Sequence, residues 1–281
     1  MKRLDGKVVV ITGAASGIGR ALSVDAARRG GLLALSDVDS PGLQQTADLV
    51  KQATGQEVRL DKLDVRDREA WKEYAGTVAA DFGHVDVVIN NAGVALSGDF
   101  ELLTYDQFDL IMDVDFWGVV QGSKEFLPHL IASGDGHLVN ISSLFGLMAV
   151  PGQSAYNAAK FGVRGFTEAL RQEMLLNGHP VQVTCVHPGG IKTAIARNAV
   201  AVGVDQATHA DFFDKHLAKT SAEKAAKIIL DAMLAGKARV LVGPDAKVLD
   251  ALVRLTGSGY QRLVARTTGR ALRKNLPASK Q

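Results

Sequence analysis

Short apolar runs alternate along the chain with longer segments whose apolar residues have helical spacing. Residues 7–11 form a valine-rich run that stops at Gly13, a pattern that predicts a buried strand. Residues 17–29 carry Ile18, Ala21 and Leu22 at helical spacing and predict a helix. The same pattern predicts further strands at residues 32–36, 57–63, 85–89, 136–141, 181–186 and 239–243. It predicts further helices at residues 44–54, 68–82, 105–130, 155–177 and 221–235, the longest of these central helices ending near Pro128.

The order of these elements predicts the architecture. Strands that are buried on both faces are apolar almost throughout, and in parallel sheets such strands alternate with helices. The sequence therefore predicts an α/β fold, a doubly wound parallel sheet with helices on both faces. No segment rich in proline, glycine or serine divides the chain. We expect a single catalytic domain over residues 1–245, followed by a basic, amphipathic C-terminal tail over residues 246–281.

Composition narrows the class of protein. Of the 281 residues, 47% are hydrophobic and 22% are charged, which excludes a mainly disordered or fibrous chain. The single cysteine excludes an intramolecular disulfide and a cysteine-rich zinc site. The histidines show no metal-ligand spacing, so we expect no metal. No apolar run reaches the roughly 18 residues of a membrane span, and no targeting segment stands out. We therefore expect a cytoplasmic protein.

The formal net charge of +2 conceals an uneven distribution. Residues 246–281 contain eight lysines and arginines against one acidic residue, Asp250, so the tail is basic and the rest of the chain is mildly acidic. We expect the tail to pack on its own subunit or a neighbouring one, and to matter for assembly more than for chemistry. Contact with a membrane surface of acidic lipid is a less favoured alternative. Specific binding of nucleic acid is not expected, because no recognition motif is present.

A glycine-rich turn joins the first predicted strand to the first predicted helix. It has the sequence Thr12-Gly13-Ala14-Ala15-Ser16-Gly17-Ile18-Gly19. Glycines in such a turn let the backbone approach a pyrophosphate at the positive end of the helix, although the pattern alone also fits a plain turn. Asp37 ends the second predicted strand. A carboxylate there can bind both ribose hydroxyls of NAD and repel the 2′-phosphate of NADP. Capping of the following loop is the alternative role for Asp37.

Tyr156 and Lys160 share one face of a predicted helix, because they are four residues apart. A phenol with a pKa of about 10 is a poor base at neutral pH. A neighbouring ammonium favours the phenolate and brings this pKa toward the working range. On its own, this pair also fits an ordinary solvated helix face.

Five motifs occur in a fixed order along the chain. They are Thr12-Gly13, Asn90-Asn91-Ala92-Gly93, Ser142-Ser143, Tyr156 with Lys160, and Pro188-Gly189. Together they closely resemble the motifs of the classical short-chain dehydrogenases/reductases, over roughly residues 4–245. The resemblance implies a Rossmann-type fold and a hydride transfer between NAD, with NADP the less favoured cofactor, and an alcohol or ketone. It also implies assembly into a homodimer or homotetramer.

The resemblance implies a role for each motif. Tyr156 would be the catalytic acid/base, Lys160 would lower the pKa of Tyr156 and hold the nicotinamide ribose, and Ser143 would complete the catalytic set. Ser143 and Tyr156 would also bind the substrate oxygen, beside Phe145. The residues that would bind the cofactor are Gly13, Ser16, Gly17, Ile18, Gly19, Asp37, Asp64, Val65, Asn91, Ala92, Gly93, Tyr156, Lys160, Pro188, Gly189, Ile191 and Thr193.

One position departs from the family pattern. The family usually has asparagine in a V-N-x-x-G stretch of the long helix, where this chain has Val114-Asp115-Phe116-Trp117-Gly118. The asparagine holds a water that links the lysine to solvent, and a carboxylate can accept a hydrogen bond from that water but cannot donate one. We therefore count Asp115 among the catalytic candidates and expect it near Lys160 through a water. If ionised, it would raise the pKa of Tyr156; if protonated, it would mimic asparagine.

The segment between residues 194 and 220 predicts the kind of substrate. It contains Val204, Phe212, Phe213 and other apolar residues, which suit a lid that closes over a ligand. With Leu144 and Phe145, this segment favours an apolar alcohol or ketone. The leading hypothesis is an NAD-dependent alcohol dehydrogenase or carbonyl reductase. The alternative is a regulatory or scaffold protein that binds the cofactor and has lost turnover; a hydro-lyase or epimerase on the same fold is less favoured still.

Overall fold

Seven parallel strands form one sheet at the centre of the protein. The structure is a computed structural model that describes residues 1–193, 195, 199–203 and 218–266. The strand order is β11-β7-β6-β4-β1-β2-β3, and every neighbouring pair is parallel. The strands are β1 (Val8–Thr12), β2 (Leu32–Asp37), β3 (Arg59–Lys62), β4 (Val87–Asn90), β6 (Gly136–Ile141), β7 (Val181–Pro188) and β11 (Arg239–Val242).

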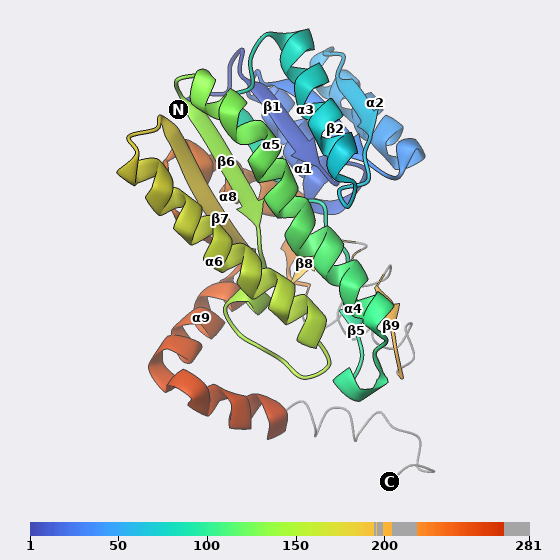
Figure 1. The fold of residues 1–281 in the computed structure, drawn as a ribbon, viewed down its shortest axis with the longest axis vertical. Helices are drawn as coiled ribbons and strands as arrows, with labels where there is room; N and C mark the ends of the chain where they lie inside the picture. Colours follow the sequence, from blue (N-terminus) through green and yellow to red (C-terminus); the bar gives the residue numbers. More distant parts are fainter. Residues whose placement is uncertain (194, 196–198, 204–217, 267–281) are drawn as a thin grey trace.

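Helices cover both faces of this sheet (Figure 1). One face carries α1 (Gly17–Arg28), α2 (Ser40–Thr54) and α8 (Ala222–Leu234), and the other carries α3 (Arg68–Phe82), α5 (Gly118–Ala132) and α6 (Ser154–Leu176). Side chains of β1 alternate between the two cores: Val9 and Ile11 pack on the first, and Val10 packs on the second. The predicted doubly wound α/β fold is confirmed.

Shorter elements lie around the carboxyl ends of the strands. Two small parallel pairs join β5 (Leu96–Ser97) to β9 (Val200–Ala201) and β8 (Ile191–Lys192) to β10 (Thr220–Ser221). The remaining described helices are η1 (Phe100–Leu102), α4 (Tyr105–Met112), η2 (Asp113–Trp117), η3 (Leu144–Gly146), α9 (Pro244–Thr256) and η5 (Gly257–Gly259). No described helix is long and apolar enough to cross a membrane. Val204, Phe212 and Phe213 of the expected lid lie outside the described residues.

The single long helix predicted over residues 105–130 was wrong in two respects. It is divided into α4 and α5 by η2, a π-helical turn, and it continues past Pro128 to Ala132. Phe126 and Leu130 are fully buried on either side of the proline. Their packing on the sheet outweighs the one backbone hydrogen bond that proline removes.

The first residues of the predicted C-terminal tail are part of the folded domain. α9 starts at Pro244, so the predicted boundary after residue 245 falls in its first turn, and Ala246 is fully buried. α9 follows β11 in the chain, and Figure 1 shows α9 beside the loop that leads into α6. Four of the basic residues in the predicted tail, Arg270, Arg273, Lys274 and Lys280, lie outside the described residues.

The connectivity creates a crevice between β1 and β4. From β1 the chain runs outward through β2 and β3, and it then crosses back to place β4 on the other side of β1. In open parallel sheets, ligands bind at such a reversal, outside the carboxyl ends of the strands. The glycine-rich turn follows β1 and the Asn91-Ala92-Gly93 segment follows β4. The fold therefore gathers the predicted motifs at one edge.

Candidate active site

The glycine-rich turn has the shape of a phosphate cradle. Gly13 has a left-handed φ of 63°, and a side-chain carbon there would lie 2.7 Å from the Cα of Ala92. A side-chain carbon on Gly19 would lie 2.1 Å from the carbonyl oxygen of Gly13. Ser16 is the N-cap residue of α1, yet its side chain caps none of the helix N–H groups. Those groups can therefore receive an anion, which fits the pyrophosphate of a dinucleotide.

Hydrogen bonds lock this turn to the segment after β4. The Thr12 hydroxyl accepts from the backbone N–H groups of Asn91 and Ala92, both at 3.0 Å. The Asn91 side chain donates to the carbonyl oxygens of Thr12, at 2.9 Å, and Gly13, at 3.2 Å. The two walls of the crevice are thus held at a constant separation.

Asp37 lies beside the glycine-rich turn. Its carboxylate accepts from the backbone N–H of Ala15 at 2.9 Å and from that of Asp39 at 3.0 Å. Among the described residues no lysine or arginine forms an ion pair with it. A carboxylate has about four lone-pair sites, so two remain for other donors. The arrangement fits a ligand that brings two hydroxyl groups.

Asp64 and Val65 follow β3, next to this part of the crevice. The carboxylate of Asp64 binds the side chain and backbone of Arg66, and this contact holds the pKa of Asp64 below its usual value. Val65 is buried, and its carbonyl oxygen accepts from the indole N–H of Trp71 at 2.9 Å. Val65 is therefore held in place at the edge of the crevice, whereas the carboxylate of Asp64 is already bound to Arg66.

The segment after β7 closes the crevice from the other side. Pro188 ends the strand, and the next N–H, that of Gly189, donates to the carbonyl oxygen of Val242 at 2.9 Å. Ile191 is buried in the small β8–β10 sheet. The methyl carbon of Thr193 lies 3.1 Å from the position of a side-chain carbon on Gly17. The structure thus brings the predicted segment against the glycine-rich turn.

Ser143, Tyr156 and Lys160 lie together at the carboxyl end of β6. Ser143 is the N-cap residue of η3, and its hydroxyl accepts from the N–H of Phe145 at 3.1 Å. Nζ of Lys160 lies 5.5 Å from the centre of the Tyr156 ring. The ring of Phe145 meets that of Tyr156 edge-on, with 6.2 Å between their centres. Ser143, Tyr156, Lys160 and Phe145 therefore share one site.

Asp115 contacts Lys160 directly, and not through the water that we expected. It is fully buried in the π-helical turn η2, where one carboxylate oxygen accepts from the N–H of Val94 at 2.8 Å. The other oxygen lies 3.1 Å from Nζ of Lys160. Nζ also donates to the carbonyl oxygen of Ile141 at 3.4 Å. Asp115 lies in a π-helical turn, a feature that sequence periodicity does not reveal.

Comparison with known proteins now identifies the family. The model of the short chain dehydrogenases matches residues 7–202. SadH of Mycobacterium tuberculosis, a protein named for an inferred oxidoreductase activity, is 62% identical over 266 residues, which are 94% of this chain and 96% of SadH. This chain belongs to the short-chain dehydrogenase family. As a member of that family, it is an oxidoreductase.

Solved dehydrogenases share this fold. One from Burkholderia phymatum, in complex with NAD, superposes with a TM-score of 0.86 at 28% identity and covers 93% of this chain and 97% of its own. An alcohol dehydrogenase from Thermococcus sibiricus, complexed with 5-hydroxy-NADP, has a TM-score of 0.70 at 28% identity, with 84% and 94% covered. Both hold a nicotinamide cofactor or a derivative of one.

The short-chain dehydrogenase site contains three coupled titratable groups. Burial raises the pKa of the Tyr156 phenol; Lys160 and the side chain of Ser143 oppose this, and Asp115 reinforces it. Burial alone would lower the pKa of Lys160, but Asp115 and Tyr156 outweigh it and raise that pKa. Burial also raises the pKa of Asp115, against the effect of Lys160. A proton that is gained or lost at this site therefore cannot be assigned to one of the three groups alone.

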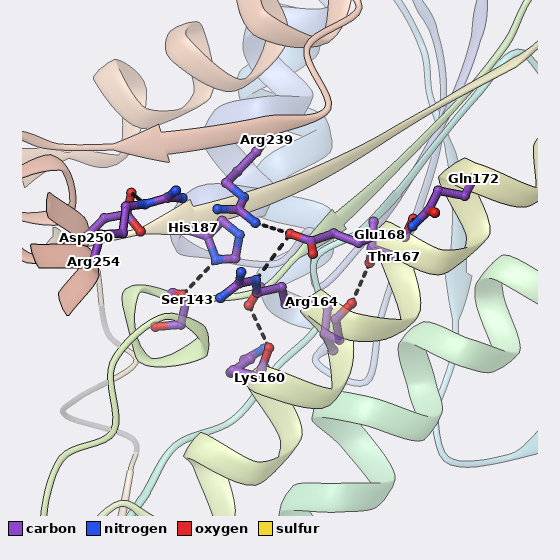
Figure 2. A network of polar contacts seen from close by, with 12 residues as sticks. Ser143, Lys160, Arg164, Thr167, Glu168, Gln172, His187, Arg239, Asp250 and Arg254 are labelled. Carbon is purple, nitrogen blue, oxygen red and sulfur yellow. Dashed lines mark hydrogen bonds and ion pairs between the residues drawn. The ribbon is translucent and has the colours of Figure 1, made fainter. Parts of the chain in front are cut away.

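Two residues that were not among the predicted site residues, His187 and Asn157, support the backbone of the site. His187 is fully buried at the end of β7, and its Nδ1 donates to the carbonyl oxygen of Ser143 at 3.0 Å (Figure 2). Burial lowers the pKa of His187 to about 4, so the imidazole is neutral and holds the backbone of the serine. Asn157 donates to the carbonyl oxygens of Phe145, at 2.7 Å, and Met148, at 3.2 Å. The only sign of Asn157 in the sequence is its place between Tyr156 and Lys160.

Proposed function

We propose that this short-chain dehydrogenase is an NAD-dependent alcohol dehydrogenase or carbonyl reductase that acts through Ser143, Tyr156 and Lys160. The observation that carries the proposal is the grouping of these side chains beside the crevice. Nζ of Lys160 lies 5.5 Å from the centre of the Tyr156 ring, and Lys160 and Ser143 both oppose the rise that burial causes in the pKa of Tyr156. A hydroxyl, a phenol and an ammonium in this order form a proton donor and acceptor next to a nicotinamide site.

Each residue has a distinct role in the proposed reaction. The hydroxyls of Ser143 and Tyr156 donate hydrogen bonds to the oxygen of a substrate ketone, and the phenol then delivers its proton to that oxygen. In the reverse direction the phenolate takes the proton of the alcohol, and the positive charge of Lys160 favours the phenolate. When bound, the nicotinamide supplies or accepts the hydride at the substrate carbon.

Asp37 supports NAD as the cofactor. Its carboxylate lies against the backbone N–H of Ala15 in the glycine-rich turn, where the ribose of the adenosine half would lie. Arg20, one residue after the turn, donates to the hydroxyl of Thr46 at 3.0 Å and to the carbonyl oxygen of Gly42 at 3.2 Å. Its guanidinium is thus engaged with α2, and a 2′-phosphate would meet the charge of Asp37 first.

Apolar side chains near Tyr156 support an apolar substrate. Phe145 stands edge-on against the phenol, and Leu144 beside it is buried. Ile195 and Val200, in the segment after Thr193, are 36% and 40% exposed. Burial of a hydrocarbon chain against such groups is favourable by about 25 cal/mol for each Å² removed from water. We therefore propose an apolar alcohol or ketone.

A panel of ketones of increasing chain length tests the proposal. The purified protein is mixed with NADH and each ketone in turn, and NADH absorbance is followed. We expect oxidation that increases with apolar chain length. Tyr156→Phe should lower the rate about 100-fold or more, because general acid-base groups contribute at least that much. Tyr105→Phe is the matched control, since Tyr105 is 89% exposed.

The binding of NADH separates the two hypotheses. Tyr156→Phe should leave NADH binding nearly intact, because the phenol acts on the substrate. The regulatory or scaffold alternative is correct if the unmutated protein binds NADH but none of the ketones supports NADH oxidation. It must then also form no NADH from the corresponding alcohols. If Tyr156→Phe keeps more than about a tenth of the rate, another group is the acid/base.

A further inference from the structure

The C-terminal segment reaches two different loops of the site. After β11 the chain forms α9 and η5, and described residues continue to 266. Asp245 lies in the first turn of α9, and Tyr260 directly follows η5. Asp245 contacts the loop on the cofactor side, whereas Tyr260 contacts the loop on the substrate side. The hydrogen bonds described for these two side chains go to backbone N–H groups of the loops.

Asp245 anchors the segment that follows β7. Its carboxylate accepts from the backbone N–H of Gly190 at 2.7 Å. It also packs so closely on the neighbouring residue that a side-chain carbon on Gly189 would lie 2.2 Å from the same oxygen. Among the described residues no cation forms an ion pair with Asp245, but the N-terminus of α9 favours its negative charge. Through Gly190 it positions the chain that leads to Thr193, against the glycine-rich turn.

Tyr260 anchors the loop between Ser143 and α6. Its side chain is buried, with 7% exposed, and its hydroxyl accepts from the backbone N–H of Ala149 at 3.0 Å. Asn157 of α6 holds the same loop from the other side, through Phe145, Met148 and the N–H of Val150. The phenol of Tyr260 therefore completes the support of the loop that carries Phe145.

We propose that residues 244–260 form a positioning element of the active site, in which Asp245 holds the cofactor-side loop and Tyr260 holds the substrate-side loop. This proposal rests on the proposed function for the identity of the two sides. It gives the start of the C-terminal segment a part in the chemistry, where the sequence suggested assembly. Because the two hydrogen bonds hold different loops, we expect loss of one to affect cofactor binding and loss of the other to affect substrate binding.

Hydrogen exchange followed by mass spectrometry tests the anchors without any substrate. Tyr260→Phe removes only the hydroxyl, so residues 144–152 should exchange faster while residues 188–193 stay unchanged. Asp245→Ala should do the opposite. Asp245→Asn keeps an acceptor for the N–H of Gly190 and should restore most of the protection. The matched controls are Tyr105→Phe and Asp250→Asn; Asp250 lies on α9 and pairs only with Arg254 among the described residues.

Binding and kinetics then link each anchor to its side of the site. Asp245→Ala should weaken NADH binding about tenfold or more, because a hydrogen bond to a charged group is lost. Tyr260→Phe should raise the KM of a ketone about threefold and leave NADH binding unchanged, because a neutral hydrogen bond is weaker. A variant that merely destabilised the fold would not separate the two ligands in this way.

Certain results would overturn the positioning role. One is unchanged exchange in both loops for Tyr260→Phe and Asp245→Ala alike; another is equal acceleration of both loops in either variant. If Asp245→Ala does not fold, Tyr260→Phe still decides the matter for its own loop. Exchange and NADH binding need no turnover, so a failure of the proposed ketone reduction would be seen separately.

Discussion

Replacing Asp115 with asparagine removes one negative charge from the centre of the site. One carboxylate oxygen lies 3.1 Å from Nζ of Lys160, and the same Nζ lies 5.5 Å from the centre of the Tyr156 ring. The ammonium of Lys160 therefore interacts with a carboxylate as well as with the phenol that it is proposed to activate. An ionised Asp115 disfavours the phenolate, so its removal should lower the pKa of Tyr156.

The two distances set a minimum for the effect. The oxygen of Asp115 and the centre of the ring can be no more than about 9 Å apart, and the phenolate oxygen is at most about 3 Å further away. Two unit charges about 12 Å apart, at an effective dielectric constant of about 20, interact by about 1.4 kcal/mol. That energy corresponds to about one pKa unit. We expect the pKa of Tyr156 to fall by at least this amount.

The assay is the pH dependence of kcat/KM for alcohol oxidation, measured by NADH formation. Oxidation needs the phenolate, so the rate should rise toward alkaline pH in the unmutated enzyme. Asp115→Asn should remain active and move this rise to lower pH by about one unit. Asp113→Asn is the matched control, because Asp113 lies on the same π-helical turn but is exposed.

Two outcomes would refute the reasoning. An unmoved profile in Asp115→Asn would mean that Asp115 carries no charge in the working enzyme, as burial favours. Complete loss of activity would mean that the carboxylate itself acts in the reaction. Because the three groups titrate together, the shift describes the set and not Tyr156 alone.

Two further predictions concern the cofactor and stability. Asp37→Ala should weaken NAD and relax discrimination against NADP by about 1–3 kcal/mol, measured as the ratio of kcat/KM values; equal use of both cofactors by the unmutated enzyme would contradict this. Burial lowers the pKa of His187 to about 4 and that of His137 to about 3, both below their ordinary value of 6.5. As the pH falls below 6.5, the unfolded chain gains protons that the fold does not. The free energy of unfolding in urea should therefore fall by about 2 kcal/mol per histidine between about pH 7.5 and pH 5, and the fall should be smaller in His187→Gln; an equal fall in both proteins would refute the assignment.

The sequence alone predicted the elements and most of the candidate site. Strands such as β1 are continuous apolar runs because both faces are buried, and that pattern is local. Tyr156 and Lys160 share a helix face because four residues make about one turn. Parallel strands end at a common edge, so motifs that follow strands had to meet there. The positions of Asp37 and Thr193 beside the glycine-rich turn follow from the same rule.

Only the tertiary structure decided how distant side chains meet. The direct contact of Asp115 with Lys160 depends on a π-helical turn, and the periodicity of the long helix gives no sign of it. Gly190 and Asp245 are 55 residues apart, and Ala149 and Tyr260 are 111 apart. Contacts at such separations depend on where α9 lies after the edge strand β11. That position is set by the packing of the whole domain, because the residues of α9 by themselves specify a helix and one apolar face but no partner for it.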